Sequence, residues 1–579
     1  MNFLLKSICF QKLSELHHIL SGKFLITAFV FSSLLSHSQD LEQIGKSKAI
    51  KFSGTLNIQG GPYIYLGKGE PRNDPFWWIA TGSPMISIYG WQLPFSFSVG
   101  SRNRSFSQPF NRFGVSPYYK WATFHFGYRS IRFNPYIMSG LQFLGAGVEL
   151  NPKGLRFAAF YGRFAKAIRE DTNASITPIP AYKRTGMGVK LGVGNRRSYF
   201  DLMLFHAADD TNSIQTPVSN QYAEITPQEN LAVGISSRIA FLKRMNFQFD
   251  LAGSMLNRDA RQEVLEDIDK VNPIRSFFAP KIGFQFLTAG QASLNLNFKH
   301  AGLRIHYRRV DPDYRSLGAF YQQSDLQALT FDPSFRLFKN KLRLSGSIGK
   351  QQDNLYKRKA FTSVRNIGSA GIVFAPNRTY TGDFTFSNFG IAQQAGLQVL
   401  NDSFRVAQVN RTFSTGHQIN LSNKQRNLNL NFNISYQELK DLNPFSTGSS
   451  ENQVWYSNFQ VTRIRVRDNM SLNGGVNFSR NQFANGIFLL AGPMAGFSKS
   501  LMKEKFVMSS NLSYNFGFQS GKSSGGTINW YSSLQYRLSK THLFSLNLNV
   551  LQNSTPYFSS GNFAEIRLLG GYILSLQSK

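Results

Sequence analysis

Residues whose types suit catalysis occur in this chain without the spacing that catalysis needs. The string Gly521-Lys522-Ser523-Ser524-Gly525 matches the Gly-x-Ser-x-Gly pattern of a nucleophilic serine, but that pattern requires a strand that leads into a helix. Here a turn rich in Gly and Ser joins two segments with strand periodicity. The sequence also does not match a phosphate-binding loop, since three residues separate Gly517 and Gly521 where four are needed. We therefore predict that the chain is not an enzyme and carries no cofactor.

Metal ligands are also scattered. Of the nine histidines, no two outside the N-terminal region have ligand spacing, and the one cysteine is Cys9. One acidic cluster could attract a cation, but it lacks the glycine-centred spacing of a calcium loop and also fits a short solvated helix within a loop. Its members are Asp259, Glu263, Glu266, Asp267 and Asp269. We favour the solvated helix and predict no metal site.

Two basic ladders have the period of a strand. In each, three basic residues alternate with apolar ones, so that the three share one face: Arg304, His306 and Arg308 in the first, and Arg463, Arg465 and Arg467 in the second. If the strands cross a membrane, these faces should point to the lumen, because Arg on the lipid side at mid-depth costs about 2 to 4 kcal/mol. The ladders then either hydrate the lumen and pair with carboxylates, or form an electropositive wall that selects anions.

Tryptophan residues suggest membrane interfaces. Trp77 and Trp78 lie in a stretch without clear strand periodicity, so we place them in a loop. They could form a platform on which sugars stack, or they could belong to the girdle of aromatic residues at a membrane interface.

The elements that would position these residues are strands. Asn427 to Tyr436 alternates polar and apolar residues without a fault, and Ser293 to Lys299 and Phe544 to Val550 do the same. From Ile50 onward the chain holds roughly 24 to 26 such segments of about 9 to 13 residues, the length of a tilted membrane strand. The pattern predicts an all-β fold, a transmembrane antiparallel β-barrel of about 26 strands (range about 22 to 26).

Short turns alternate with longer polar loops, as expected of periplasmic turns and extracellular loops. The long loops are predicted at 67–82, 165–183, 207–230, 257–276, 311–325, 351–365 and 441–453. No stretch before the barrel is long enough for a folded plug domain. We therefore expect inward-folded loops or a partner protein to close the lumen, with Gly67 to Gly82 and Asn257 to Ser276 as the candidate loops.

The N-terminus has the pattern of an export signal. The apolar run from Phe24 to Leu35 follows Lys23 and ends in Ser36-His37-Ser38, a small-x-small cleavage pattern. We assign residues 1–38 to a cleaved signal peptide, 39–49 to a short periplasmic segment and 50–579 to the barrel. Cys9 leaves with the signal, so the mature chain is free of cysteine.

Composition agrees with a membrane barrel. Aromatic residues make up 14% of the chain and charged residues 17%, while mean hydropathy is only −0.25, because lipid-facing and lumen-facing residues average out. The formal charge is +32, and the basic surplus is spread thinly along the strands, which argues against nucleic acid as a partner. Lipopolysaccharide phosphates and anionic solutes in a pore are the expected partners.

Two blocks of sequence resemble a known group. The region Gln108 to Ala167, which begins QPFNRFGVSPYYKWATFHFGYRS, and the region Val310 to Gly349, with Asp311-Pro312-Asp313-Tyr314, are similar to large, poorly characterised outer-membrane β-barrel proteins of the Bacteroidota. The resemblance implies the cell outer membrane of a Gram-negative bacterium and a multi-pass barrel exported through the periplasm. It implies no activity for any residue.

The sequence thus predicts a porin-like channel or transport protein with a wide, basic, polar lumen for anionic or polar cargo. The alternative is a scaffold or barrel subunit of an outer-membrane secretion or assembly complex. Outer-membrane lipid and lipopolysaccharide are expected around it, and a plug, a lipoprotein or a secretion or assembly protein could be its partner.

Overall fold

The computed structural model describes residues 50–101, 110–170, 179–214, 224–265, 278–320, 323–359, 361–395, 407–423, 425–442, 451–555 and 561–577. The predicted signal peptide and the segment 39–49 lie outside the described residues. The first strand begins at Ile50, where the alternating pattern begins.

Thirty strands make up the described secondary structure. Those of the first half are β1 (Ile50–Gly67), β2 (Phe76–Gly82), β3 (Met85–Ile88), β4 (Trp91–Gly100), β5 (Arg112–Val115), β6 (Tyr118–Tyr119), β7 (Ala122–Arg129), β8 (Met138–Ser139), β9 (Phe143–Leu150), β10 (Leu155–Ala165), β11 (Arg184–Gly194), β12 (Tyr199–Asp209), β13 (Glu229–Phe241), β14 (Met245–Asn257) and β15 (Gln285–Asn297).

Those of the second half are β16 (Ala301–Val310), β17 (Gly318–Ala319), β18 (Leu326–Leu337), β19 (Leu342–Gln352), β20 (Phe361–Phe374), β21 (Tyr380–Ala395), β22 (Ala407–Ser422), β23 (Arg426–Asp441), β24 (Asn452–Arg465), β25 (Met470–Phe483), β26 (Gly486–Leu501), β27 (Phe506–Gln519), β28 (Lys522–Arg537), β29 (His542–Ser554) and β30 (Phe563–Gln577).

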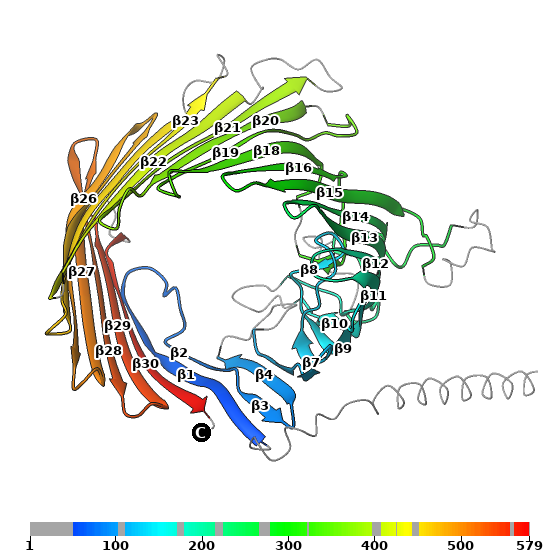
Figure 1. Ribbon diagram of the computed structural model, residues 1–579, viewed down its shortest axis with the longest axis horizontal. Coiled ribbons are helices and arrows are strands. Elements are labelled where there is room, and N and C mark those ends of the chain that lie inside the picture. Colours follow the sequence, from blue (N-terminus) through cyan, green and yellow to red (C-terminus); the bar gives the residue numbers. More distant parts are fainter. Residues whose placement is uncertain are drawn as a thin grey trace, which may run out of the picture.

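Twenty-eight of these strands form one sheet that closes into a ring, because β1 pairs with β30 at the far end of the chain (Figure 1). Both β2 and β3 pair with β1 and β4, so together they are one interrupted strand, and β5 and β6 likewise stand between β4 and β7. The ring therefore has 26 antiparallel strands (28 less two), and the predicted fold and strand number are confirmed.

Alternation along each strand separates an apolar outer face from an inner face. On β11 the exposed residues Met187, Val189 and Leu191 alternate with the buried Gly188 and Lys190. On β23, Leu430 and Phe432 share the outer face, while Asn429, Asn431 and Asn433 share the inner one. An apolar outside with no free strand edge is the β-structure that lipid accepts, because a closed ring leaves no row of unpaired backbone groups at an edge. The described residues contain no helix of the length and hydropathy needed to cross a membrane.

The two ends of the barrel differ. Twelve connections of two to five residues lie at one end, such as 195–198 and 466–469, and the chain also enters β1 there. The connections at the other end include all the long ones, among them 166–183, 258–284 and 311–325. We call these the short-turn end and the long-loop end. In bacterial outer-membrane barrels the short turns are the periplasmic ones.

Candidate functional site in the barrel lumen

A buried apolar core lies inside the ring, where a water-filled barrel would have only polar side chains. The segment 130–142, between β7 and β9, turns inward from the long-loop end and carries β8 into the ring, against the wall of β9 to β14 (Figure 1). Ile131, Tyr136, Ile137 and Met138 of this segment are each at most 2% exposed. We call residues 130–142 the first inward loop.

Aromatic residues of the barrel wall receive this loop. Phe143, Phe160 and Phe205, on the inner faces of β9, β10 and β12, are buried in the same core. The rings of Phe143 and Phe160 stack at 4.8 Å, and Phe160 lies 6.3 Å from Phe205. Such rings would be costly on a wetted inner wall, and in this structure the loop covers them.

Glycines of the inner wall make room for the loop. A Cβ atom on Gly234 of β13 would lie 2.3 Å from the Cδ1 atom of Ile137, and one on Gly188 of β11 would lie 2.9 Å from the ring of Phe133. Atoms cannot approach this closely, so a larger side chain at either position would press on the loop and also on the wall, where Phe160 would lie 2.6 Å from a Cβ on Gly188 and the Leu251 carbonyl oxygen 2.7 Å from one on Gly234. The sequence thus leaves small residues in the wall where the loop side chains enter.

A second inward loop completes the core. We give this name to residues 311–320, which follow β16 and contain β17. Tyr314 and Leu317 are buried in the same cluster, and β17 pairs in parallel with β8 of the first loop. The Ser316 hydroxyl donates to the Ile137 carbonyl oxygen at 2.7 Å. The two loops therefore form one internal body.

Polar side chains tie this body to the wall. The side-chain amide of Asn134 donates to the Leu251 carbonyl oxygen at 3.1 Å, while its oxygen accepts from the backbone N–H groups of Tyr136 and Ile137, both at 2.9 Å. The oxygen of buried Asn230 accepts from the N–H of Leu317 at 3.1 Å. Burial raises the pKa of the Tyr314 hydroxyl, so that this group remains a hydrogen-bond donor.

Charged groups surround the internal body on the same side of the lumen. Arg156 makes a bidentate pair with Asp201, with N···O distances of 2.7 and 2.9 Å, and its guanidinium lies 4.3 Å from the centre of the Tyr199 ring. His125 and Glu149 are 3.0 Å apart. The Arg156–Asp201 ion pair and the His125–Glu149 contact join strands of the wall, so these side chains are already partnered.

The first basic ladder lies on this inner wall. On β16, Arg304, His306 and Arg308 stand opposite the inner-face residues Asn295, Ser293 and Gln291 of β15. Arg308 lies 6.0 Å from the centre of the Tyr136 ring, which places it at the edge of the first inward loop. Arg304 faces Asp332 of β18.

The second basic ladder is on the outer face, and its predicted lumen position is wrong. Arg463 stands opposite Leu428 of β23 and shares its face with Val461 and Phe459, which face lipid. Arg465 is on the same face, and Arg467 lies in the turn 466–469. The expected cost of about 2 to 4 kcal/mol applies to mid-depth and falls to about 0 to 1 kcal/mol near the interfaces, which is where this ladder lies.

The loop assignment of the two tryptophans is also wrong. Trp77 and Trp78 belong to β2, where they stand opposite Gly61 and Gly60 of β1. Adjacent residues of a strand point to opposite faces, so the two rings cannot form a common platform. Trp78 is on the outer face and 41% exposed, as expected of a girdle residue.

The first of the two loops that the sequence suggested for the lumen is shorter than predicted but reaches the inner wall. Between β1 and β2 only 68–75 is a loop, because the strands extend to Gly67 and Phe76. Its Arg72 lies 3.4 Å from Glu565, a buried residue on the inner face of β30. Of the second candidate, residues 266–276 lie outside the described part. The sequence did hold a signal for the first inward loop: the Asn134-Pro135 pair breaks strand periodicity between two alternating segments.

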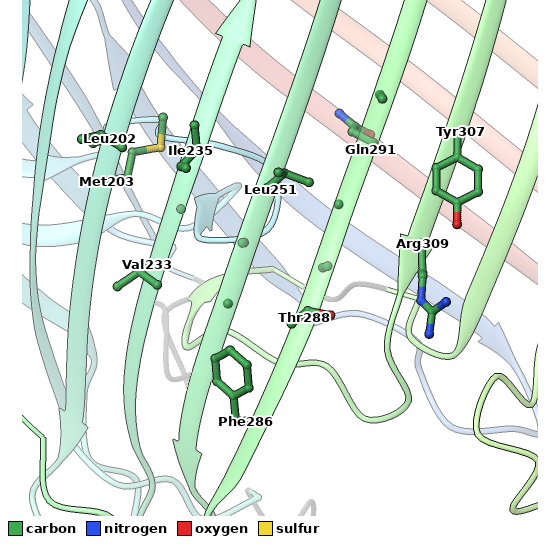
Figure 2. Close-up of a pocket in the computed structure, with 16 residues that line it drawn as sticks. Leu202, Met203, Val233, Ile235, Leu251, Phe286, Thr288, Gln291, Tyr307 and Arg309 are labelled. Atoms are coloured by element: carbon green, nitrogen blue, oxygen red, sulfur yellow. The ribbon is translucent and has the colours of Figure 1, made fainter.

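A surface groove over β12 to β16 faces lipid and not the lumen. It encloses about 710 Å³ and is lined by outer-face side chains that include Val233, Leu251 and Phe286, with Tyr307 and Arg309 at one edge (Figure 2). Gly253 and Gly290 lie among these side chains on the outer face. An apolar groove on this face suits acyl chains, so it is not part of a path for polar cargo.

The metal and serine candidates of the sequence do not form a recognisable site in the described residues. No group of three or more His, Cys, Asp or Glu residues among them could hold a metal ion. In the acidic cluster, Asp259 pairs with Arg261 at 2.7 Å, and residues 266–269 lie outside the described part. Ser523 belongs to β28, just after the two-residue turn from β27, so no helix comes after it.

Comparison with known proteins gives no family. No family model and no curated protein matches the chain. Among solved structures, the outer membrane protein opdK from Pseudomonas aeruginosa is 13% identical and covers 60% of this chain and 94% of its own, with a TM-score of 0.30. The P pilus usher (PapC) translocation pore is 11% identical over 91% of this chain and 100% of its own, with a TM-score of 0.37.

The ferric-catecholate import receptor Fiu from E. coli K12 is 8% identical over 90% of this chain and 81% of its own, also with a TM-score of 0.37. At these scores the similarities carry no argument about activity. A function for this chain therefore has to rest on the geometry of its lumen.

Proposed function

We propose that this chain is an outer-membrane channel or transport protein that passes polar or anionic cargo along one side of its lumen. The observation that carries the proposal is the one-sided filling of a 26-strand ring. Barrels of about 16 to 18 strands already enclose an aqueous channel. The internal body is buried against β9 to β16, which leaves the opposite wall as the side for passage.

That opposite wall is polar and close to neutral. On β23 the inner positions hold Asn427, Asn429, Asn431 and Asn433, and on β25 they hold Asn473, Asn477 and Asn481, with Ser and Gln between or beside them. Amides and hydroxyls exchange hydrogen bonds with water and with solutes at little cost. A wall of this kind suits hydrated cargo of many shapes.

Selection for anions would come from the first basic ladder. Arg304, His306 and Arg308 line the inner wall of β16 beside the internal body, and rings or rows of Arg favour anions in a pore. On the next strand, β18, Asp332 stands opposite Arg304, whereas the uncharged Thr330 and Ala328 stand opposite His306 and Arg308. The ladder thus offers positive charge at the boundary between the filled and the open side.

Planar bilayers test both parts of this proposal. The purified chain should form ion-conducting pores with a reversal potential that favours anions in a salt gradient. Replacing Arg304 and Arg308 by Ser should reduce the anion preference, while Arg463→Ser with Arg465→Ser, which changes the same charge on the outer face, should leave it unchanged. Pores without anion preference would contradict a selective role of the first basic ladder. The same holds if both double variants changed the reversal potential equally.

Ring size also favours a second candidate, a barrel subunit of an outer-membrane secretion or assembly complex. A lumen of 26 strands with one uncovered wall can hold a partner chain, a plug or a lipoprotein. Gentle-detergent extraction from native membranes separates the candidates. A lone channel should emerge without partners in fixed ratio, whereas a subunit of a complex should bring them along.

A further inference from the structure

Basic charge is concentrated at one end of the barrel. The described residues of the twelve short turns hold 14 Lys and Arg and two acidic residues, a net charge of +12. The described residues of the long-loop connections hold 13 basic and 12 acidic residues, a net charge of +1. The described strands also carry a basic surplus, as the sequence alone suggested, but of the connections only those of the short-turn end are strongly basic. This difference marks the short-turn end as the end that attracts anions.

Part of this charge stands on the lipid-facing surface. Arg426 at the start of β23 lies directly opposite Arg465 of β24. Arg465 stands opposite Met470 of β25, which stands opposite Lys499 of β26. Strands are about 4.8 Å apart, so the three cations occupy one short row of the outer face.

Arg463 adds a fourth cation one row further into the apolar band. It is flanked on the neighbouring strands by Leu428 and Leu472, and the next row holds Leu430 and Val461. A long side chain in this place extends its guanidinium toward the membrane interface while its stem stays in the apolar layer. All four charged groups therefore meet at the boundary between the apolar band and the short turns.

Carboxylates of the chain do not balance this patch. Within the described residues, the one ion pair made by the four is that of Arg465 with Asp468, at 3.8 Å, where both side chains are about half exposed. Like charges directly opposite each other on neighbouring strands repel, so Arg426 and Arg465 need an external anion between them. The anion must be one that lies at the interface of a membrane.

We propose that Arg426, Arg463, Arg465 and Lys499 form a binding site for the phosphate group of anionic phospholipids in the periplasmic leaflet. The guanidinium groups donate paired N–H groups to the phosphodiester oxygens, and the apolar rows beside Arg463 contact the acyl chains. The site fixes the depth and tilt of the barrel in the bilayer, whatever crosses the lumen.

Native mass spectrometry of the full-length protein in detergent tests the site, with phosphatidylglycerol as the probe and phosphatidylcholine as the zwitterionic comparison. The wild-type chain should retain phosphatidylglycerol with about tenfold higher affinity, because the paired Arg contacts require a net anion. The variant R426Q/R463Q/R465Q/K499Q should lose this preference, and R463Q/R465Q should lose part of it.

A matched control exists at the same end. Arg336 and Arg343 also face each other across neighbouring strands, β18 and β19, but on the inner face. R336Q/R343Q should bind phosphatidylglycerol like the wild type. Heat-dependent migration in detergent gels shows that each variant is folded.

Three results with phospholipids would overturn the proposal, namely equal binding of both phospholipids by the wild type, unchanged binding by the quadruple variant, or an equal loss in R336Q/R343Q. Lipopolysaccharide provides the last comparison. If the patch bound it more tightly than phosphatidylglycerol, and the quadruple variant abolished that binding, the site would belong to the other leaflet and the assignment would be wrong.

Discussion

The hydroxyl of Tyr314 donates a hydrogen bond of 2.9 Å to the backbone carbonyl oxygen of Tyr136, a residue 178 positions earlier in the chain. The two rings also meet edge to face, with centroids 6.2 Å apart. Both residues are buried, at 3% and 1% exposure. This contact joins the two inward loops, so that one cannot leave the lumen without breaking buried contacts of the other.

Tyr314→Phe should loosen the internal body without unfolding the barrel. The change leaves the buried Tyr136 carbonyl oxygen without its donor, which costs about 1 to 3 kcal/mol. We expect single-channel recordings with more frequent excursions to higher conductance. Tyr531→Phe is the matched control, because the Tyr531 hydroxyl donates to Asn547 at 3.2 Å on the opposite wall. Equal current noise in both variants would contradict a role for the link between the loops.

Gly234→Val should displace the first inward loop. Its added Cβ would lie 2.3 Å from the Cδ1 atom of Ile137 and 2.7 Å from the Leu251 carbonyl oxygen of the wall, and overpacking of this kind costs about 1 to 3 kcal/mol. We expect trypsin to cleave faster after Arg132, the one basic residue of the loop, as measured by mass spectrometry of the fragments. Gly474→Val, where the nearest atom is 3.9 Å away, should cleave like the wild type. No difference between the two variants would show that the loop does not depend on the wall glycines.

Acidification should release the connection between β19 and β20. Burial alone would raise the pKa of Asp325, but hydrogen bonds from Lys359 and from the backbone N–H groups of Leu355 and Asn354 outweigh it and hold the pKa below its ordinary value of 3.8. A carboxylate with a lowered pKa stabilises the fold fully above its ordinary pKa and loses that contribution as pH falls through the folded-state value.

Hydrogen exchange of residues 353–359, corrected for the intrinsic rate at each pH, measures this release. We expect protection at neutral pH that declines below about pH 4, and constant low protection in Asp325→Asn. Asp210→Asn, which alters an exposed pair with Lys183 at 3.8 Å, should behave like the wild type. If residues 353–359 stayed protected from exchange in Asp325→Asn, contacts other than those of Asp325 would hold this connection in place.

The sequence predicted the barrel well because the period of two is a local property. Runs such as Asn427 to Tyr436 alternate within themselves, so strand length and strand number could be counted without any tertiary information. The sequence also distinguished the two ends of the barrel, because the length of each connection is the number of residues between successive strands.

The lumen could not be read in the same way. Whether residues 130–142 fold inward depends on contacts with distant residues such as Leu251 and Tyr314. The predicted lumen position of the second basic ladder was wrong for a different reason. Period two shows that Arg463 and Arg465 share a face, but depth in the membrane, set by the turn at 466–469, decides whether that face can be the outer one.

The direct test of a channel narrowed from one side is single-channel conductance in planar bilayers before and after the internal body is removed. Short Gly-Ser linkers would replace residues 130–142 and 311–320 together, and heat-dependent gel migration would confirm a folded barrel. The wild type should form stable pores of intermediate conductance, and the loop-free variant should conduct several times more current because the filled side of the lumen opens. A wild type that conducts no ions, or equal conductance with and without the loops, would contradict this function.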